Sequence, residues 1–416
     1  MRLSLLLCLL PAVLLLGSCT SNEITQWRGP ARNGIYPDKN LLNEWPADGP
    51  ELELSIANVG KGLSQPLVYN NKIYITGIKH DTLDVLSVYD WEGSLLWEKD
   101  FSRSWPRTYP ESRGTPTIED NRIYLIGGDA ALVCLNAGNG ELIWKQNPHS
   151  NFSGKYQYWG IVESVLLTDN AALYVTGGEE TTVVAYHKKT GELLWKSEST
   201  GGPKSYASSA LVEWGGLQIA LIQTANDIIG IDVSNGDVLW TYNTIQYHTE
   251  KGDGEAANTP LFYNGELFIT YGNEQPGMLF TLADDARSIS LKWTNDILDT
   301  HHGGLVLLDG VIYASNMIDN TRGNWAAVDW QSGQTLWEEK WHTKGSVIAA
   351  DGMLYFYEEK QGNIALVQPD RTRLKVVSTF QMKDGQGPHW AHPSIYNKHL
   401  LVRHGNVLNI YSLKGE

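Results

Sequence analysis

The stretch TGELLW at residues 190–195 decides how this chain is interpreted, because near-copies of it occur four more times. In every copy a glycine is followed four residues later by a tryptophan. A sixth unit ends at Trp293 and carries Arg287 in place of the glycine. A phrase that returns at a roughly regular interval indicates an internal repeat. The other copies are EGSLLW (92–97), NGELIW (139–144), NGDVLW (235–240) and SGQTLW (332–337).

A second repeated phrase consists of two apolar runs around an Asn-Asn, Asn-Gly or Asp-Gly type turn, as in QPLVYNNKIYI (65–75). This is the signature of a β-hairpin. Together with a further strand and the tryptophan strand, each unit has four short strands in about 40–50 residues, which is typical of a propeller blade. We therefore predict an all-β fold, an eight-bladed β-propeller of four-stranded antiparallel blades. The units begin near Gln65, Thr115, Ser164, Ser209, Thr259, Gly304, Ser346 and His392.

Ring closure is predicted to involve both ends of the chain. The eighth unit has room for only three strands before Glu416, whereas PELELSIANVG (50–60) is an alternating run that precedes the first hairpin. We expect this run to supply the missing fourth strand, because an open ring would leave an unpaired sheet edge. The repeated tryptophans are expected to pack between neighbouring blades rather than to contact a ligand, since periodicity indicates packing.

Composition excludes some functions. The formal net charge is −15 and no basic cluster is present, which argues against a nucleic-acid partner. Beyond the N-terminal region the single cysteine is Cys134, at a place where other blades have Ala or Gly, so we expect a buried, unreactive thiol. We also expect a monomer.

The N-terminus has the features of an export signal. Residues 1–18 contain one Arg and an apolar run too short for a comfortable membrane span. Leu16-Gly17-Ser18-Cys19 resembles a bacterial lipobox, which predicts lipidation of Cys19; an ordinary secretory signal with an incidental cysteine is the alternative. We assign 19–45 to a lipid-anchored tether and N-terminal segment and 46–416 to the propeller. The lipid would attach the chain to a bacterial membrane. We favour the outer membrane, at its periplasmic face or at the cell surface, because Thr20 is not the Asp that retains lipoproteins in the inner membrane.

The chain resembles the PQQ-like β-propeller repeat family, in particular its exported bacterial members. The resemblance extends from Trp27 to the end and includes, besides the repeat, the phrases TQWRGPARNGIYP (25–37), KGLSQPLV (61–68), HHGGLVLLDG (301–310), KGSVIAADG (344–352) and HWAHPSI (389–395). It implies an eight-bladed propeller and leaves function open, since the family includes quinone-dependent dehydrogenases and assembly scaffolds.

Three functions are therefore considered, the third being an outer-membrane assembly factor that engages partner proteins by edge or rim contacts. The first is a non-catalytic binding or assembly module that uses its central funnel for a protein or small-molecule ligand, without a cofactor or metal. The alternative is a PQQ-dependent quinoprotein oxidoreductase of the alcohol or sugar dehydrogenase type. Resemblance to those enzymes implies PQQ held over Ca²⁺, often with a disulfide between adjacent cysteines, and this chain lacks a Cys-Cys pair. We prefer the first function and predict no catalytic residues.

Candidate ligand-binding residues follow from propeller geometry, because residues just before each hairpin collect on one rim of the channel. These candidates are Arg113, Trp159, Glu163, Tyr206, Asn258, His301, His302, Lys344, Trp390 and His392, with Gln65, Tyr158 and Ser208 nearby.

Each candidate has a structural alternative. Trp159 and Trp390 lie outside the repeated tryptophan position and are the strongest candidates for ligand contact. Arg113 and Glu163 come from adjacent blades and could instead pair with each other. His301 and His302 are expected to point in opposite directions in an extended segment, which disfavours a metal pair. The loop that contains Asp253 and Glu255 could add acceptors, or could simply be solvated.

Overall fold

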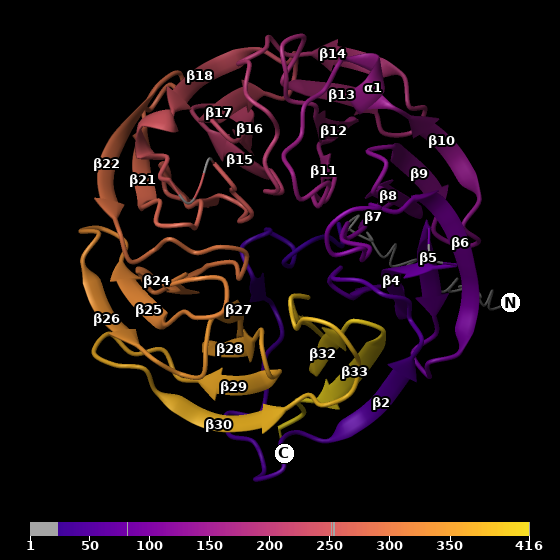
Figure 1. Cartoon of the computed structure of the whole chain (residues 1–416), viewed down its shortest axis with the longest axis vertical. Helices are drawn as coiled ribbons and strands as arrows, with labels where there is room; N and C mark the ends of the chain where they lie inside the picture. The colour runs from indigo at the N-terminus through magenta and orange to yellow at the C-terminus, as the bar shows by residue number, and fades with distance from the viewer. Residues whose placement is uncertain (1–23, 81, 251, 253, 416) are drawn as a thin grey trace, which may run out of the picture.

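Eight β-sheets form a ring around a central channel (Figure 1). The structure is a computed structural model that describes residues 24–80, 82–250, 252 and 254–415. The predicted eight-bladed propeller is confirmed. Each blade begins within two residues of the position expected from the sequence.

The first four blades each contain four antiparallel strands, numbered from the channel outward. Blade 1 contains β3 (Leu67–Tyr69), β4 (Lys72–Lys79), β5 (Leu83–Tyr89) and β6 (Leu95–Arg103). Blade 2 contains β7 (Thr117–Glu119), β8 (Arg122–Ile126), β9 (Leu132–Asn136) and β10 (Leu142–Gln146). Blade 3 contains β11 (Leu166–Leu167), β12 (Ala171–Val175), β13 (Val183–His187) and β14 (Leu193–Lys196). Blade 4 contains β15 (Ala210–Trp214), β16 (Leu217–Gln223), β17 (Asp227–Asp232) and β18 (Val238–Asn243).

The remaining blades follow the same order. Blade 5 contains β19 (Leu261–Tyr263), β20 (Glu266–Ile269), β21 (Gly277–Leu282) and β22 (Ile289–Asn295). Blade 6 contains β23 (Val306–Leu308), β24 (Val311–Ser315), β25 (Trp325–Asp329) and β26 (Thr335–Glu339). Blade 7 contains β27 (Gly345–Ala350), β28 (Met353–Glu358), β29 (Asn363–Val367) and β30 (Val376–Gln381), with β1 (Ile35–Tyr36) added in parallel to β27. Blade 8 contains β31 (Ser394–Tyr396), β32 (His399–His404), β33 (Val407–Ser412) and β2 (Leu52–Ala57). Two short helical turns, α1 (Pro148–Asn151) and η1 (Ile245–Tyr247), lie in connecting loops.

The ring closes as expected, because β2 pairs in antiparallel fashion with β33 and forms the outer strand of blade 8. An N-terminal strand and the C-terminal strand therefore share one sheet, and β2 pairs the outer edge of β33 that would otherwise be open.

The repeated phrase builds one kind of contact between blades. A Cβ atom added to Gly191 would lie 2.8 Å from the ring of Trp144 in the preceding blade, and one on Gly236 would lie 2.5 Å from the ring of Trp195. Both glycines have a positive φ, near 74° and 86°. The glycine thus allows a left-handed turn, and because it lacks a side chain the tryptophan ring of the preceding blade packs directly against its backbone. Gly140 and Gly333 seat Trp97 and Trp293 in the same way.

In four of the six units the indole nitrogen adds a hydrogen bond to a carbonyl of the next blade. Trp144 Nε1 donates to the Lys188 carbonyl of the next blade at 3.0 Å, and Trp195 Nε1 donates to the Val233 carbonyl at 3.0 Å. In the unit without the glycine, the left-handed turn residue is Ala286 (φ 60°), which shares a buried cluster with Trp240. The prediction that these tryptophans join neighbouring blades is confirmed.

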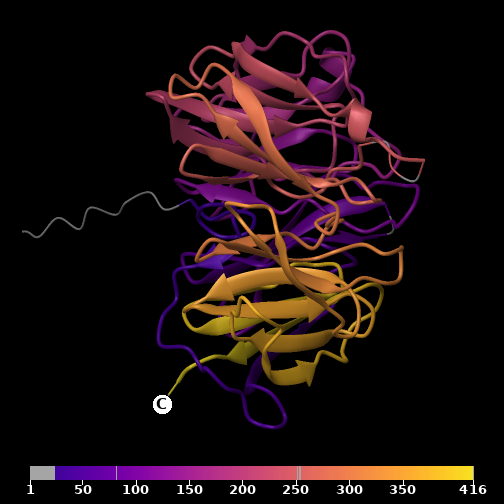
Figure 2. The same cartoon turned by 90° about the vertical axis from the view of Figure 1, so that its left-hand side faces the viewer.

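The two faces of the propeller differ. One face, called here the turn face, carries the tight turns between the first and second strands, such as Asp120–Asn121 and Asp351–Gly352. The opposite face, called the loop face, carries the longer connections between blades. In Figure 2 the C-terminus lies on the turn face and η1 lies on the loop face.

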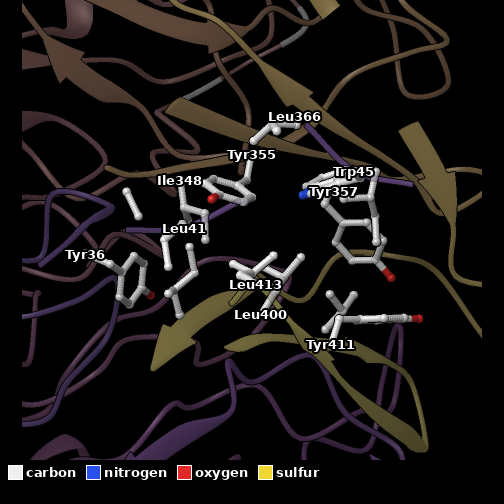
Figure 3. Close-up of a cluster of buried hydrophobic side chains, with 14 of the residues drawn as sticks. Tyr36, Leu41, Trp45, Ile348, Tyr355, Tyr357, Leu366, Leu400, Tyr411 and Leu413 are labelled. Atoms are coloured by element: carbon white, nitrogen blue, oxygen red, sulfur yellow. The ribbon is translucent and has the colours of Figure 1, made fainter. Parts of the chain in front are cut away.

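Residues 24–45, which the sequence analysis groups with the tether, pack against the propeller. Residues 25–36, called here the plug, run into the central channel and end in β1. Tyr36, Leu41 and Trp45 then join a hydrophobic cluster formed by blades 7 and 8, around Tyr355 and Tyr411 (Figure 3).

The expected state of Cys134 is confirmed. Its thiol is free and buried, and burial raises its pKa to about 12, so the unreactive thiol form dominates at neutral pH. The predicted signal peptide and Cys19 lie outside the described residues. No helix among residues 24–80, 82–250 and 254–415 is long and apolar enough to cross a membrane.

Candidate functional site

The plug closes the channel with Arg28. Its guanidinium donates to the carbonyls of Val347 at 3.1 Å and Leu305 at 2.6 Å, and Nη1 lies 2.8 Å from His392 Nδ1. Its backbone N–H donates to Gln65 Oε1 at 2.8 Å. These partners belong to blades 7, 6, 8 and 1.

Arg32 and Trp27 contact the other four blades. Arg32 donates to the carbonyls of Ser164 at 3.2 Å and Ser209 at 3.0 Å, which belong to blades 3 and 4. Trp27 Nε1 donates to a hydroxyl of blade 5, and Arg32 donates to one of blade 2; the acceptors are Thr259 Oγ1 at 3.2 Å and Thr117 Oγ1 at 3.4 Å. Three plug side chains and one plug N–H therefore contact all eight blades.

Both plug guanidiniums are buried, and neither forms an ion pair with a carboxylate among the residues that the structure describes. Burial lowers the pKa of Arg28 to about 10 and the pKa of Arg32 to about 9, so both remain charged at neutral pH. Inner-strand carbonyls supply the compensating partial charge.

A cavity of about 270 Å³ opens on the loop face, with the plug as its floor. Trp27 and His392 lie at the floor, with ring centroids 4.6 Å apart. The side walls come from the loops that enter the first strand of each blade, with additions from loops inside blades 5 and 6. The plug fills the channel beneath the cavity and blocks access from the turn face. A ligand therefore enters the cavity from the loop face.

Aromatic side chains form one wall of the cavity. Tyr109 lies between Trp390 and Trp159, with ring centroids 4.9 Å and 6.2 Å away. Tyr109 is 49% exposed and Trp159 is 37% exposed, so both rings are open to solvent. Tyr109 also has a φ of 47°, a left-handed conformation that is uncommon for a bulky residue. Such strain is often found at binding sites.

Arg113 holds this wall in place. Its guanidinium donates to the Thr108 and Tyr109 carbonyls at 2.7 Å and 2.8 Å, and to the Trp159 carbonyl of the next blade. Burial lowers its pKa. The possible pair between Arg113 and Glu163 is not formed, because Nη1 and Nη2 of Arg113 donate to these carbonyls and Glu163 pairs with Lys204 instead. Arg113 is therefore a positioning residue for Tyr109 and Trp159.

The expectation for His301 and His302 is wrong. Their ring centroids are 4.6 Å apart and both side chains line the cavity, because the chain bends after His301 instead of staying extended. Asn258 fixes this bend: its Nδ2 donates to the Thr300 and His301 carbonyls at 2.7 Å and 2.9 Å, and its Oδ1 accepts from Gly304 N–H.

The histidines of the cavity are neutral. Burial, followed by the nearby Lys344 ammonium, lowers the pKa of His301 to about 3, and the pKa of His302 is also well below its usual value. His392 has a pKa of about 3, lowered by burial and by Arg28. Its Nε2 donates to the His302 carbonyl at 2.8 Å, so Nδ1 accepts from Arg28.

The charged groups around the cavity are engaged by neighbours. Lys344 forms a buried ion pair with Glu359, whose other carboxylate oxygen lies 3.5 Å from His302 Nε2. Glu255 accepts hydrogen bonds from Trp159 Nε1 at 2.7 Å and from Asn273 Nδ2 at 2.8 Å. The cavity therefore has aromatic walls and few free charges.

Eight of the ten candidate residues line the cavity, and two do not. Glu163 is buried behind it, in an ion pair with Lys204 at 2.7 Å, and Asn258 supports the histidine bend from below. Sequence reasoning missed Tyr109, whose loop gives no periodic signal. It also missed Trp27, although the phrase TQWRGPARNG occurs once and lies outside the repeat, which could have indicated a separate role for that segment. Asp253 lies outside the described residues.

The cavity does not fit the PQQ and Ca²⁺ of the alternative function. Ca²⁺ takes about 6–8 oxygen ligands, including carboxylates, yet Glu255 is the single carboxylate among the described lining residues. PQQ carries three carboxylates, whereas Nη1 and Nη2 of Arg113 donate to backbone carbonyls and Lys344 is paired with Glu359. No group of three or more His, Cys, Asp or Glu side chains that could hold a metal ion occurs in the part of the chain that the structure describes.

The fold and this site define a class: a PQQ-like propeller whose channel is plugged and whose open cavity has aromatic walls. The family model described as "Outer membrane protein assembly factor BamB" matches residues 81–339, more than half of the chain, and the chain belongs to this family. The resemblance noted from the repeat is therefore confirmed.

Individual relatives are distant. The chain is 22% identical over 299 residues to the outer membrane protein assembly factor BamB of Yersinia pestis, covering 69% of this chain and 70% of the relative. It is 23% identical over 230 residues to an uncharacterised protein of Rickettsia conorii, covering half of each.

Solved structures show the same fold. BamB from Moraxella catarrhalis superposes with a TM-score of 0.63 at 14% identity, covering 88% of this chain and 98% of that one. Quinohemoprotein alcohol dehydrogenase from Comamonas testosteroni superposes with a TM-score of 0.67 at 12% identity, covering 93% and 79%. At such identities the likeness concerns the fold alone, which BamB and a dehydrogenase share.

Proposed function

We propose that this protein is a lipid-anchored, exported binding module that takes part in assembling outer-membrane proteins and has no catalytic role. The observation that carries the proposal is the loop-face cavity. Its walls are aromatic residues outside the repeated tryptophan position, and the charged side chains around it are paired with neighbouring protein groups. Family membership supplies the process, since the matching model and the Yersinia pestis relative are described as outer membrane protein assembly factors.

The chemistry of the cavity favours an uncharged group of a partner polypeptide as the ligand. Exposed aromatic rings contribute large contact areas at low entropic cost. A volume of about 270 Å³ is slightly below the range of about 300–1,000 Å³ that is usual for small-molecule pockets. It suits one or two inserted side chains.

The proposal is tested by deleting the gene in its host. We expect less folded, heat-modifiable β-barrel protein in the outer membrane, measured by gel electrophoresis of unheated and heated outer-membrane fractions, and restoration by the unmodified gene. An unchanged content of folded barrels would contradict the assembly role.

Two further measurements test the lipid anchor and the quinoprotein alternative, one each. Cys19→Ala should move the protein from the membrane fraction to the soluble exported fraction, since no described helix could hold it in a membrane. Purified protein supplied with PQQ and Ca²⁺ should show no dye-linked oxidation of alcohols or sugars. Turnover that requires both additions would instead establish the quinoprotein alternative.

A further inference from the structure

The plug enters and leaves the channel by the turn face. Thr25 exchanges two backbone hydrogen bonds with Ile118, at 3.0 Å and 2.8 Å, two residues before the Asp120–Asn121 turn of blade 2. Tyr36 pairs with Ala350, directly before the Asp351–Gly352 turn of blade 7. The described chain therefore begins on the turn face, at blade 2, on the side of the molecule opposite the cavity.

The proposed anchor lies very close to this point. Ile24 follows Cys19 by five residues. An extended chain spans at most about 3.3–3.6 Å per residue, so the lipid-bearing residue is within about 18 Å of the turn face of blade 2. This step rests on the lipidation that the proposed function includes.

The turn face of the same part of the ring exposes aliphatic side chains. The outer strands of blades 1, 2 and 3 each begin with two adjacent large aliphatic residues, between 41% and 54% exposed. These six residues, called here the aliphatic patch, are Leu95, Leu96, Leu142, Ile143, Leu193 and Leu194. In blade 4 the corresponding Val238 and Leu239 are partly buried, and blade 5 has the polar Ser290 in this region.

The patch is centred on the blade where the described chain begins. Three strand spacings of about 4.8 Å separate the inner strand β7 from the outer strand β10, a distance of about 14 Å. The anchor segment is therefore long enough to place the lipid beside the patch. Exposed aliphatic pairs at the same place on three neighbouring blades indicate an interaction surface.

We propose that the aliphatic patch rests on the surface of the lipid bilayer that holds the anchor, so that blades 1–3 face the membrane and the cavity opens away from it. The tether favours a weak apolar contact, because it keeps the patch at a high effective concentration near the bilayer. β27 alone spans about 20 Å from the loop face to the turn face. The cavity is thus held clear of the lipid headgroups and accessible to partners in the aqueous compartment.

Local charge indicates that the contact is apolar rather than electrostatic. Glu92, Glu141 and Glu192 each stand within three residues before an aliphatic pair. Carboxylates at these places give no attraction to anionic lipid. The contact should therefore persist at high salt.

The test uses full-length protein purified from membranes and reconstituted into vesicles of phosphatidylethanolamine and phosphatidylglycerol that contain a nitroxide-labelled lipid. A single fluorophore is attached at Leu194→Cys in the patch, at Val377→Cys on the outer strand of the opposite blade 7, or at Tyr158→Cys on the loop face. Cys134 is buried and does not interfere with labelling. We expect several-fold stronger quenching at position 194 than at 377 or 158, and reduced quenching at 194 when Leu95→Ser and Leu142→Ser are added.

A mass spectrum of the same preparation reports whether Cys19 carries lipid. Lipidated protein with equal quenching at the three positions would overturn the docking proposal and leave the proposed function intact. Protein that is not lipidated would overturn both the anchor and the docking, because the argument depends on the reach from Cys19.

Discussion

The perimeter of the propeller and its centre are held together in different ways. At the perimeter one contact is repeated, a tryptophan of one blade on the turn glycine of the next, as in Trp144 on Gly191. At the centre a single short plug contacts every blade through Trp27, Arg28 and Arg32. The perimeter distributes stability over many similar sites, whereas the plug concentrates it in a few residues that have no duplicate.

This difference predicts that the largest single effect on stability comes from the plug. Arg32→Ala leaves the Ser164 and Ser209 carbonyls without their donor and opens a buried space. Buried unsatisfied groups cost about 1–3 kcal/mol each, so we expect a loss of about 5 kcal/mol. Differential scanning calorimetry of the purified protein measures it.

Arg32→Lys is the matched control for charge. A lysine keeps the positive charge but cannot present the planar fork of donors, so we expect an intermediate loss. Equal melting temperatures for the wild type and Arg32→Ala would show that the plug contributes little to the stability of the propeller.

A perimeter substitution should have a smaller effect. Trp144→Ala removes the ring that lies on Gly191 and the hydrogen bond to the Lys188 carbonyl, which predicts a loss of about 3–4 kcal/mol. The same calorimetric measurement applies. A loss greater than that of Arg32→Ala would reverse the order of the two regions.

The comparison also explains what the sequence could predict. The Gly-to-Trp phrase repeats, so its periodicity reveals the blades, their boundaries and the inter-blade position of residues such as Trp195. The plug gives no such signal, because its partners are mostly backbone carbonyls, which every residue type carries. Arg28 and Arg32 therefore looked like part of a tether.

The sequence predicted the cavity less fully than the repeated contacts but better than the plug. Its approximate place followed from propeller geometry, and Trp159 and Trp390 stood out because they break the tryptophan periodicity. The orientation of side chains did not follow, because it depends on loop bends such as the one that brings His301 and His302 together. The hydrogen-bond partners of Arg113 are backbone carbonyls, so the sequence could not predict them either.

A smaller effect is expected from pH at the junction of plug and cavity. Folded His392 stays neutral until its pKa of about 3, whereas an unfolded histidine takes up a proton near pH 6.5. The unfolded state therefore binds more protons between these values, and stability falls as pH is lowered from about 6.5 toward 3. At pH 5 the expected loss from His392 is about 2 kcal/mol.

His392→Gln tests this assignment, because an amide can still accept from Arg28 and donate to the His302 carbonyl but does not titrate in this range. The variant should lose less stability between pH 7 and pH 5 in chemical denaturation. An identical pH dependence in the two proteins would place the titrating group elsewhere.

The smallest expected effect on stability is at the cavity wall, and it tests the central claim that the cavity, rather than the repeated framework, is the functional surface. Trp159→Ala with Trp390→Ala should cost about 1 kcal/mol or less, because neither ring occupies the inter-blade position. Tyr263→Ala, which removes an exposed aromatic side chain on the turn face of blade 5, is the matched control. In a host that lacks the gene, we predict that the double variant reaches the membrane in normal amount and fails to restore the folded β-barrel content of the outer membrane, whereas Tyr263→Ala restores it. Full restoration by the double variant would contradict the account.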